Sequence, residues 1–403
     1  MNRPLIFHID VNSAFLSWEA VYQLQNGAGV DLRLIPSVVG GDQQKRHGVV
    51  LAKSTEAKKY KIMTGEPLAQ ALKKCPNLTV VPPRFDLYDQ NSKAFIEILK
   101  RFAPVVEQSS IDEAFADMTG TQLLYESPAW VAKKIAATIY EELRFTVNIG
   151  ISTNKLLAKM ASDFEKPDKI HTLFPEEMPA KMWPLPVGDL YFVGNAAKNR
   201  LQALGIQTIG DLAQCEPYFL KSHFKKYGET IYQYANGMDS SLVTRPDTSE
   251  KSYGNSTTIP YDVTDPAVAK TILLSLCETV CARLRSSAVK CSCVTVQITD
   301  CYFVNKSHQI SLPTTTNVTS EIYHIVCQLF DQLWDSHIPI RLLGVTAGKI
   351  TSSSIRQYNL FDMDKFEKME KLDAAIDKVR AKFGDNAVTR ACFLQPENKD
   401  TIP

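Results

Sequence analysis

Apolar and polar residues alternate along the first 170 residues with two different periods. A period of two predicts short strands at residues 5–10, 48–53, 79–81, 105–108, 111–117 and 145–151. A helical period predicts helices at residues 14–24, 56–62, 67–73, 87–102 and 129–143. This order of elements predicts an α+β sheet with helices packed on one face.

The pattern changes near residue 173. Short helical segments separated by glycines follow until residue 238, and the polar residues 239–252 predict an exposed linker. Beyond the linker, helices at 266–286 and 318–335 alternate with strands at 292–302 and 342–350, which predicts a small separate α+β domain. The tail contains a predicted amphipathic helix whose apolar stripe comprises Phe366, Met369, Leu372, Ile376 and Val379.

Composition narrows the class of protein. The 403 residues are enough for two to four domains, and the formal net charge of +1 means that any basic surface must be local. The nine cysteines lack the paired spacing of a zinc site, which favours free thiols. No apolar run has the length of a membrane span and the amino terminus lacks a signal-peptide pattern, so we expect a cytoplasmic protein.

Two adjacent carboxylates, Asp112 and Glu113, stand in an apolar, strand-like run, and Asp10 ends the first predicted strand. Burying these acids together is unfavourable unless cations neutralise them, and Mg²⁺ prefers carboxylate oxygens and phosphates. Neighbouring residues of a regular strand point to opposite faces, so a strand start or a bulge must re-aim Asp112 or Glu113. The alternative is that they are turn carboxylates on a surface hairpin.

Three ordered motifs resemble the Y-family of translesion DNA polymerases, in its bacterial DNA polymerase IV and UmuC group. The motifs are His8-Ile9-Asp10, Ser110-Ile111-Asp112-Glu113, and Gly-Ile-Ser-Thr-Asn-Lys-Leu-Leu-Ala-Lys at 150–159. The resemblance covers nearly the whole chain and implies a multidomain α+β right-hand polymerase. Its implied parts are a palm (1–12 and 82–172), fingers (13–81), a helical thumb (173–240), a linker (241–250), a little finger (251–350), and a clamp-binding motif with the tail (351–403).

The resemblance makes Asp10, Asp112 and Glu113 the catalytic acids. It implies that Asp10 and Asp112 bridge two Mg²⁺ ions, that Glu113 helps to hold the catalytic ion, and that the Val11 carbonyl adds a ligand. Asn12 departs from the second aspartate that many relatives carry, at a position that the family does not require as a metal ligand.

Nucleotide contacts are implied as well. Phe15 matches the steric-gate aromatic that excludes a 2′-hydroxyl, and Lys159 matches a phosphate-binding lysine. Lys155, one helical turn earlier on the same face, is expected to contact DNA. The competing interpretations are core packing for Phe15 and a solvated helix face for the lysines.

A second group of expected nucleotide contacts lies in the fingers. Val49 and Leu51 alternate on one strand and are expected to cover the nascent base pair, with core packing as the alternative. Thr55 and Lys58 stand where relatives usually carry Tyr-x-x-Arg, so Lys58 lacks the bidentate fork of arginine. We therefore expect weaker or differently shaped nucleotide binding.

Two further segments suggest macromolecular contacts. Residues 192–206 resemble a helix-hairpin-helix in which Gly194 and Gly205 allow backbone amides to meet DNA phosphates, although Phe192 replaces a common glycine. An ordinary helical turn is the alternative. The pentapeptide at 357–361 looks like the peptide that inserts into the bacterial sliding clamp; its residues are Gln357, Tyr358, Asn359, Leu360 and Phe361. A plain loop before the tail helix is the alternative there.

These features predict a monomeric, template-directed DNA polymerase of the translesion type, with low fidelity and low processivity. Its expected partners are primer–template DNA, deoxynucleoside triphosphates and the sliding clamp, without a membrane. One rival is a non-catalytic, clamp-tethered repair scaffold, which would not extend a primer. Another is a nucleotidyl cyclase, which would form a cyclic product without a primer.

Overall fold

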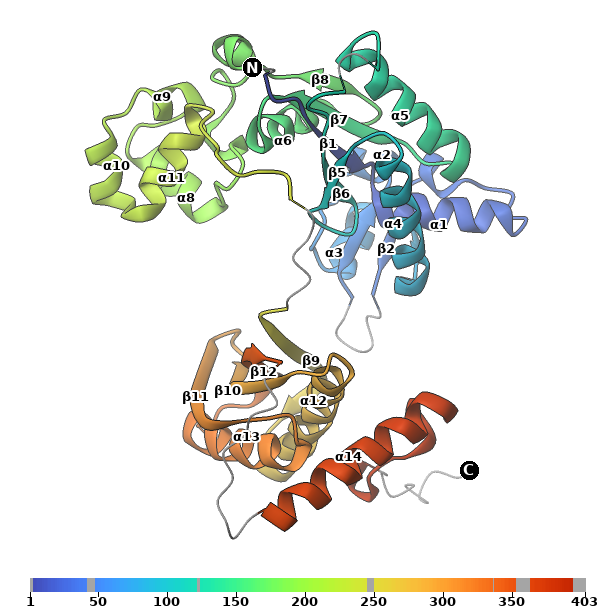
Figure 1. Ribbon diagram of the computed structural model, residues 1–403, viewed down its shortest axis with the longest axis vertical. Coiled ribbons are helices and arrows are strands. Elements are labelled where there is room, and N and C mark those ends of the chain that lie inside the picture. The colour runs from blue at the N-terminus through green and yellow to red at the C-terminus, as the bar shows by residue number, and fades with distance from the viewer. Residues whose placement is uncertain are drawn as a thin grey trace. The chain divides into compact units, whose positions relative to one another are not determined.

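The computed structural model describes residues 3–41, 48–121, 124–244, 250–335, 337–352 and 363–393, with the backbone alone for 363–366 (Figure 1). The chain forms two compact units, one made of the described residues up to 244 and the other of those from 250 onward. In the described part, no helix combines the length and apolar character that a membrane crossing requires.

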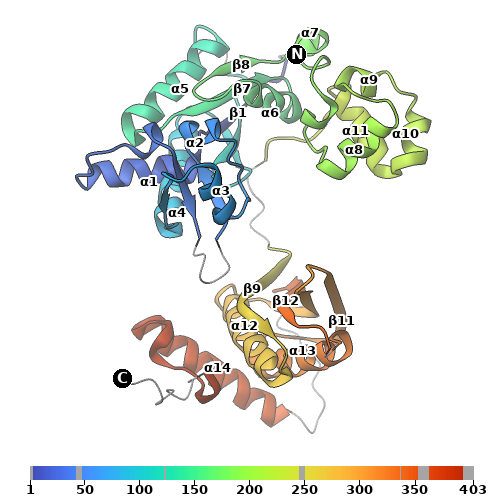
Figure 2. The same ribbon diagram turned by 180° about the vertical axis from the view of Figure 1, so that it is seen from behind.

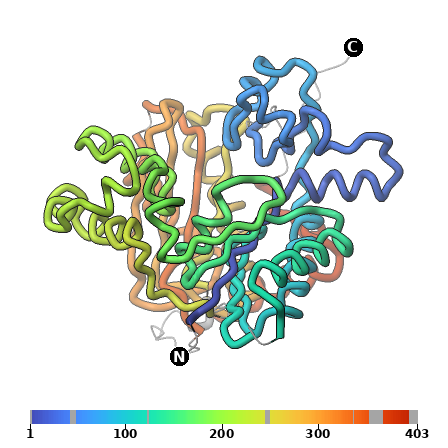
Figure 3. The backbone as a smooth tube through the Cα atoms, turned by 90° about the horizontal axis from the view of Figure 1, so that it is seen from above, coloured from blue at the N-terminus to red at the C-terminus, as the bar shows by residue number. Residues whose placement is uncertain are grey.

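The first unit contains a five-stranded sheet with the strand order β5-β6-β1-β7-β8. The strands are β1 (Ile6–Val11), β5 (Val105–Gln108), β6 (Glu113–Asp117), β7 (Val147–Ser152) and β8 (Ile170–Thr172). Strand β1 lies between β6 and β7 and runs antiparallel to both (Figure 3). Its register places Asp10 directly opposite Glu113, so these two side chains share one face of the sheet.

Helices cover both faces of this sheet, so the expectation of helices on one face is wrong. Phe7 and Ile9 share a core with residues of α4 (Phe85–Lys100) and α5 (Pro128–Leu143). On the other face, His8 Nδ1 lies 2.8 Å from the Ser162 hydroxyl of α6 (Lys155–Asp163). A Cβ on Gly150 would lie 2.0 Å from the Ala158 carbonyl oxygen, so this glycine lets α6 approach β7 closely.

A three-stranded sheet with the order β3-β2-β4 lies in the segment between residues 37 and 81. Its strands are β2 (Ser37–Gly40), β3 (Val50–Lys53) and β4 (Thr79–Val81). The neighbouring helices are α1 (Ala14–Gln25), α2 (Thr55–Lys59) and α3 (Leu68–Lys74). Ser54 caps α2 by accepting a hydrogen bond from the Ala57 amide at 2.9 Å, which fixes where the helix begins.

Short helices complete the first unit: α7 (Met178–Lys181), α8 (Asn195–Ala203), α9 (Ile209–Ala213), α10 (Pro217–Phe224) and α11 (Lys226–Ala235) (Figure 2). The predicted linker is exposed at Ser241, Leu242 and Thr244, as expected, but its chain also makes contacts with the rest of the first unit. Val243 is buried in a cluster with Ile6, Phe115 and Ala158, and the Thr244 amide donates to Glu107 at 2.9 Å.

The second unit is a four-stranded antiparallel sheet with the order β11-β10-β12-β9. Its strands are β9 (Ser252–Val263), β10 (Lys290–Asp300), β11 (Asn305–Thr316) and β12 (Ile340–Thr351). The apolar side chains of this sheet share a core with α12 (Pro266–Ser286) and α13 (Thr319–Leu333). The central strands β10 and β12 match the predicted strands. The edge strands β9 and β11 were not predicted, because their sequences are polar and lack an apolar alternation.

The predicted tail helix is present as α14 (Met363–Phe383), but part of its expected apolar stripe is exposed. Leu372 and Val379 of that stripe are 58% and 36% exposed. Asp373, between them, is only 6% exposed and accepts hydrogen bonds from the Thr319 amide at 2.8 Å and from Arg285 at 3.2 Å.

Candidate active site

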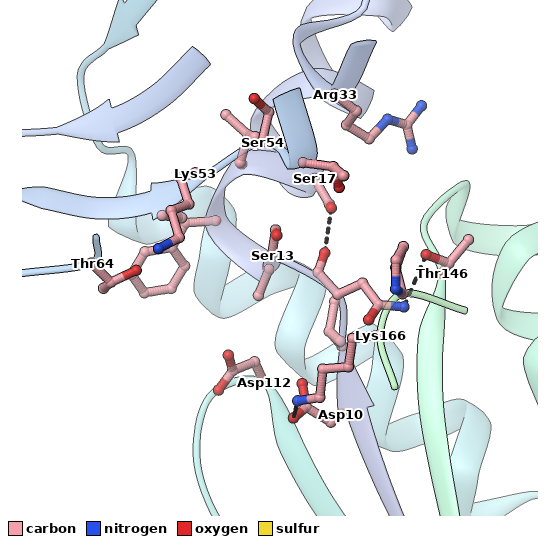
Figure 4. Close-up of a pocket in the computed structure, with 18 of the residues that line it drawn as sticks. Asp10, Ser13, Ser17, Arg33, Lys53, Ser54, Thr64, Asp112, Thr146 and Lys166 are labelled. Atoms are coloured by element: carbon pink, nitrogen blue, oxygen red, sulfur yellow. Dashed lines mark hydrogen bonds and ion pairs between the residues drawn. The ribbon is translucent and has the colours of Figure 1, made fainter. Parts of the chain in front are cut away.

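The first unit contains an open cavity of about 510 Å³ at the end of β1 (Figure 4). Acidic residues form one side, which we call the acidic floor: Asp10, Asp112 and Glu113. The segment that leads into α1 contributes Ser13 and Phe15, and the three-stranded sheet region contributes Leu51, Lys53, Thr55, Lys58 and Thr64. The cavity therefore brings together residues from segments far apart in the sequence.

Strand geometry explains how Asp112 and Glu113 both reach this cavity. The amides of Ser109 and Ser110 donate to the Glu113 carbonyl at 2.9 and 3.2 Å, so a tight turn precedes β6. Asp112 lies in that turn rather than in the strand, and its carbonyl accepts a hydrogen bond from the Val11 amide at 3.0 Å. The strand start thus re-aims Asp112, as the sequence requires, and Figure 4 shows Asp112 and Asp10 at the same side of the cavity.

Two lysines neutralise part of the acidic floor. Lys159 donates to Glu113 at 2.6 Å and lies 3.6 Å from Asp10, and Lys166 donates to Asp10 at 2.5 Å. Burial nevertheless raises the pKa of Asp10 to about 6, because it outweighs the attraction of both lysines. Burial also opposes ionisation of Glu113, but the nearby His8 ring, whose Nε2 lies 3.7 Å away, and the hydrogen bond from Lys159 hold its pKa below the ordinary range. The environment therefore pushes the pKa values of the two acids in opposite directions.

Phe15 lies in a fixed position at the wall of the cavity. Its ring stacks on Tyr88 with a centroid distance of 4.4 Å and an interplanar angle of 12°. The Tyr88 hydroxyl donates to Glu19 at 2.9 Å, which holds the supporting ring in turn. A rigid aromatic ring at this wall can exclude a bulkier ligand by steric contact.

The other expected nucleotide contacts are only partly brought together. Leu51, Thr55 and Lys58 line the cavity, whereas Val49 does not belong to its lining and forms an isolated bridge with Pro67. Lys53 and Thr64 also line the cavity, although neither is among the residues expected there from the sequence. The sequence could have predicted the position of Lys53, because Lys53 alternates with Leu51 on β3 and the two therefore share one side of the strand.

Known proteins resemble this chain over nearly its whole length. Residues 9–163 match the profile of the impB/mucB/samB family, residues 250–360 match the C-terminal domain of that family, and residues 188–239 match the profile "DNA polymerase-iota, thumb domain". The DNA polymerase IV of Clostridium acetobutylicum is 47% identical over 98% of this chain and 99% of its own length. That of Alkaliphilus oremlandii is 37% identical over 97% of this chain and 99% of its own length.

A solved structure agrees with this fold. The Y-family DNA polymerase chimera Dbh-Dpo4(243-245)-Dbh superimposes with a TM-score of 0.75 over 87% of this chain and 100% of its own, at 23% identity. The chain belongs to the Y-family of DNA polymerases. Within the family it falls in the bacterial DNA polymerase IV group, and it is a DNA-directed DNA polymerase.

The donor atoms of this polymerase's acidic floor suit a hard divalent cation. All are oxygens, from the carboxylates of Asp10, Asp112 and Glu113, with Val11 beside them in the cavity lining. Among the described residues, no three His, Cys, Asp or Glu side chains form a ready-made metal cage. The oxygen donors themselves are of the kind that Mg²⁺ prefers, since it commonly takes one or two carboxylates and completes its shell with water and substrate phosphates.

The expected DNA contacts of the polymerase lie elsewhere in the first unit. Lys155 does not line the cavity, and its ammonium donates to Glu107 at 2.6 Å. Gly194 immediately precedes α8 and has open space around it, whereas Gly205 has a φ of 86° that favours glycine. Phe192 has a φ of 78°, and Tyr227 donates a hydrogen bond to its carbonyl at 2.9 Å.

The pentapeptide 357–361 lies outside the described residues.

One face of the second unit's sheet carries uncharged residues in register across all four strands. One row contains Gln309, Thr295, Thr346 and Gly254, and the next contains Ser307, Gln297, Gly344 and Ser256. The lysines and arginines between residues 251 and 350 do not gather in these rows.

Proposed function

We propose that this polymerase extends primers across damaged templates with low fidelity and low processivity, using two Mg²⁺ ions held by Asp10, Asp112 and Glu113. The observation that carries the proposal is the convergence of these acids from two strand ends on a cavity that also contains Phe15 and Lys58. The ions would activate the primer 3′-hydroxyl and neutralise the charge that develops on the triphosphate.

The residues of the chain have separate tasks in this proposal. Lys58 and the Thr55 hydroxyl bind the phosphates of the incoming nucleotide, and Lys159 leaves Glu113 to join them. Leu51 covers the base, and its modest size leaves space above a damaged template base. Phe15 lies beneath the sugar and excludes a 2′-hydroxyl.

Primer extension with Asp112→Ala tests the metal site. Asp112 accepts a side-chain hydrogen bond from Ser110 at 2.6 Å and takes no part in the lysine ion pairs of the floor, so its removal leaves those pairs intact. We expect Mg²⁺-dependent incorporation to fall on the order of a thousandfold, because the charge stabilisation of the transition state is lost. Asp89→Ala removes an exposed acid of α4 and should behave as the unmodified protein does. Full activity of Asp112→Ala would refute the proposal.

The same assay tests the role of Phe15. Phe15→Ala should raise the incorporation of ribonucleotides relative to deoxynucleotides on the order of tens of times, because a steric exclusion is removed. Unchanged sugar discrimination would mean that another group excludes the 2′-hydroxyl.

We further propose that residues 357–361 bind the bacterial sliding clamp, which would offset the low processivity of a monomeric enzyme. Only the sequence supports this step, through its glutamine and the apolar pair Leu360 and Phe361. Replacing both apolar residues by alanine should weaken clamp binding while extension without the clamp is retained. Undiminished clamp affinity would rule out this peptide.

A further inference from the structure

The cationic side chains that line the cavity differ in their partners. Arg33 is held by Asp31 at 2.8 Å, and Lys166 is held by Asp10 and by Asp163, at 2.5 and 2.8 Å. Lys53 and Lys58 also line the cavity, but no carboxylate of the described residues lies within ion-pair distance of either ammonium. These two lysines therefore bring positive charge that nothing in the described part of the chain neutralises at close range.

Lys53 is held with its ammonium at the cavity. It lies on β3, two residues after Leu51 and on the same side of the strand. Its ammonium donates to the Ile62 carbonyl at 2.6 Å, which fixes the end of a long side chain but uses only one of three N–H donors. Figure 4 shows Lys53 and Thr64 at one side of the cavity.

The electrostatic surroundings of Lys53 are unfavourable for a cation in the free protein. Burial lowers its pKa, and the positive charge of Lys58 lowers it further. Glu66 attracts this charge and so opposes the shift, but Glu66 is already paired with Lys74 at 2.5 Å. Two cations that repel each other in one cavity are stabilised together by a ligand with several negative charges.

We propose that Lys53 is a second triphosphate-binding cation of this polymerase and acts with Lys58 on the phosphates of the incoming nucleotide. The proposal rests on the proposed nucleotide site and adds a residue to it. Lys58 offers a single point charge where an arginine would offer a fork, so a second ammonium supplies donors that Lys58 alone lacks. The competing role for Lys53 is purely structural, as the donor that satisfies the Ile62 carbonyl.

Single-nucleotide incorporation by Lys53→Met separates these roles. Methionine keeps an unbranched stem and removes the charge. We expect the KM to rise roughly tenfold for all four deoxynucleotides, because a charge-assisted hydrogen bond is lost, while kcat changes little. Lys53→Arg should recover most of the affinity. Lys59→Met is the matched control, because Lys59 pairs with Glu56 and does not line the cavity.

Inorganic tripolyphosphate tests the phosphate contact without a base or a sugar. Its inhibition constant should rise in Lys53→Met by about the same factor as the KM and should be unchanged in Lys59→Met. An unchanged KM, a rise for one base only, or undiminished inhibition by tripolyphosphate would overturn the assignment. Calorimetric binding of tripolyphosphate to the full chain gives the same test without catalysis, so a failure of Lys53 is distinguishable from an inactive enzyme.

Discussion

Two groups of buried and half-buried carboxylates in this protein have different partners. In the first unit, lysines neutralise Asp10 and Glu113 at the floor of an open cavity. In the second unit, arginines hold Asp377 and Glu278 where α14 packs on α12. The comparison shows which properties separate a candidate catalytic group from a structural one.

In the second unit, the carboxylates are held by several directional hydrogen bonds at once. Arg285 binds Asp377 through two nitrogens, Nε at 2.5 Å and Nη2 at 3.0 Å, and also contacts Asp373. Asp373 in turn accepts a hydrogen bond from the Thr319 amide. A planar guanidinium matches a carboxylate at two points, so this arrangement is specific and difficult to exchange for another cation.

The group in the first unit is open to exchange. A lysine ammonium is a compact charge on a flexible stem, and it can leave one carboxylate for another anion without breaking a bidentate contact. The same carboxylates line an open cavity, through which the proposed Mg²⁺ ions would reach them. Burial of acids is common to both groups, so burial alone does not identify the active site. We propose that exchangeable partners and an open cavity mark it.

The largest expected effect on stability comes from Asp373→Ala. This substitution leaves Arg285 without one partner and the Thr319 amide without its acceptor, which should destabilise the second unit by about 3 kcal/mol. Hydrogen exchange of the amides in α14, followed by mass spectrometry, should accelerate, while incorporation without the clamp stays within a factor of about two. Glu367→Ala removes an exposed acid of the same helix and is the control. Unchanged protection of α14 would show that the arginine group does not hold the helix.

An effect of similar size, but dependent on pH, is expected from Asp10→Asn in the metal-free protein. Because burial raises the pKa of Asp10 to about 6, its ionised form destabilises the fold. This penalty is absent below about pH 4, grows between pH 4 and 6, and is complete above pH 6, where it reaches about 3 kcal/mol. Denaturant unfolding in the presence of a chelator should therefore find Asp10→Asn more stable than the unmodified protein at pH 8 and equal to it at pH 4. Equal stabilities at both pH values would contradict the shifted pKa.

The smallest expected loss of stability comes from replacing an arginine of the second unit by lysine. Arg285→Lys keeps the charge but loses the two-point contact with Asp377, which should lower the free energy of unfolding by about 1 kcal/mol. Thermal unfolding followed by hydrogen exchange in α14 measures this loss. A loss as large as that of Asp373→Ala would mean that charge placement, rather than the fork, is the decisive property.

The sequence predicts the acidic floor because its residues stand in ordered motifs beside apolar strands. The register of β1 and β6 brings Asp10 and Glu113 together, and the turn before β6 adds Asp112. Lys53 and Lys166 could not be assigned from the same patterns, because only the folded cavity shows which lysines line it.

The same limit applies to the fold. Central strands with apolar residues are predictable, whereas β9 and β11 are polar edge strands whose pairing depends on distant partners. The charged packing of α14 could not be predicted, because hydrophobic periodicity contains no information about Arg285 and Asp373, which are 88 residues apart.

Mn²⁺ binding, measured by electron paramagnetic resonance, tests most directly whether the acidic floor exchanges its lysines for divalent ions. The full chain would be titrated in the presence of a dideoxy-terminated primer–template and the matching deoxynucleotide, in parallel with Asp112→Ala and Asp373→Ala. We predict two bound ions per chain in the unmodified protein and in Asp373→Ala, and the loss of at least one in Asp112→Ala. Equal stoichiometry in all three proteins, or no binding in the unmodified protein, would contradict the assignment of the active site.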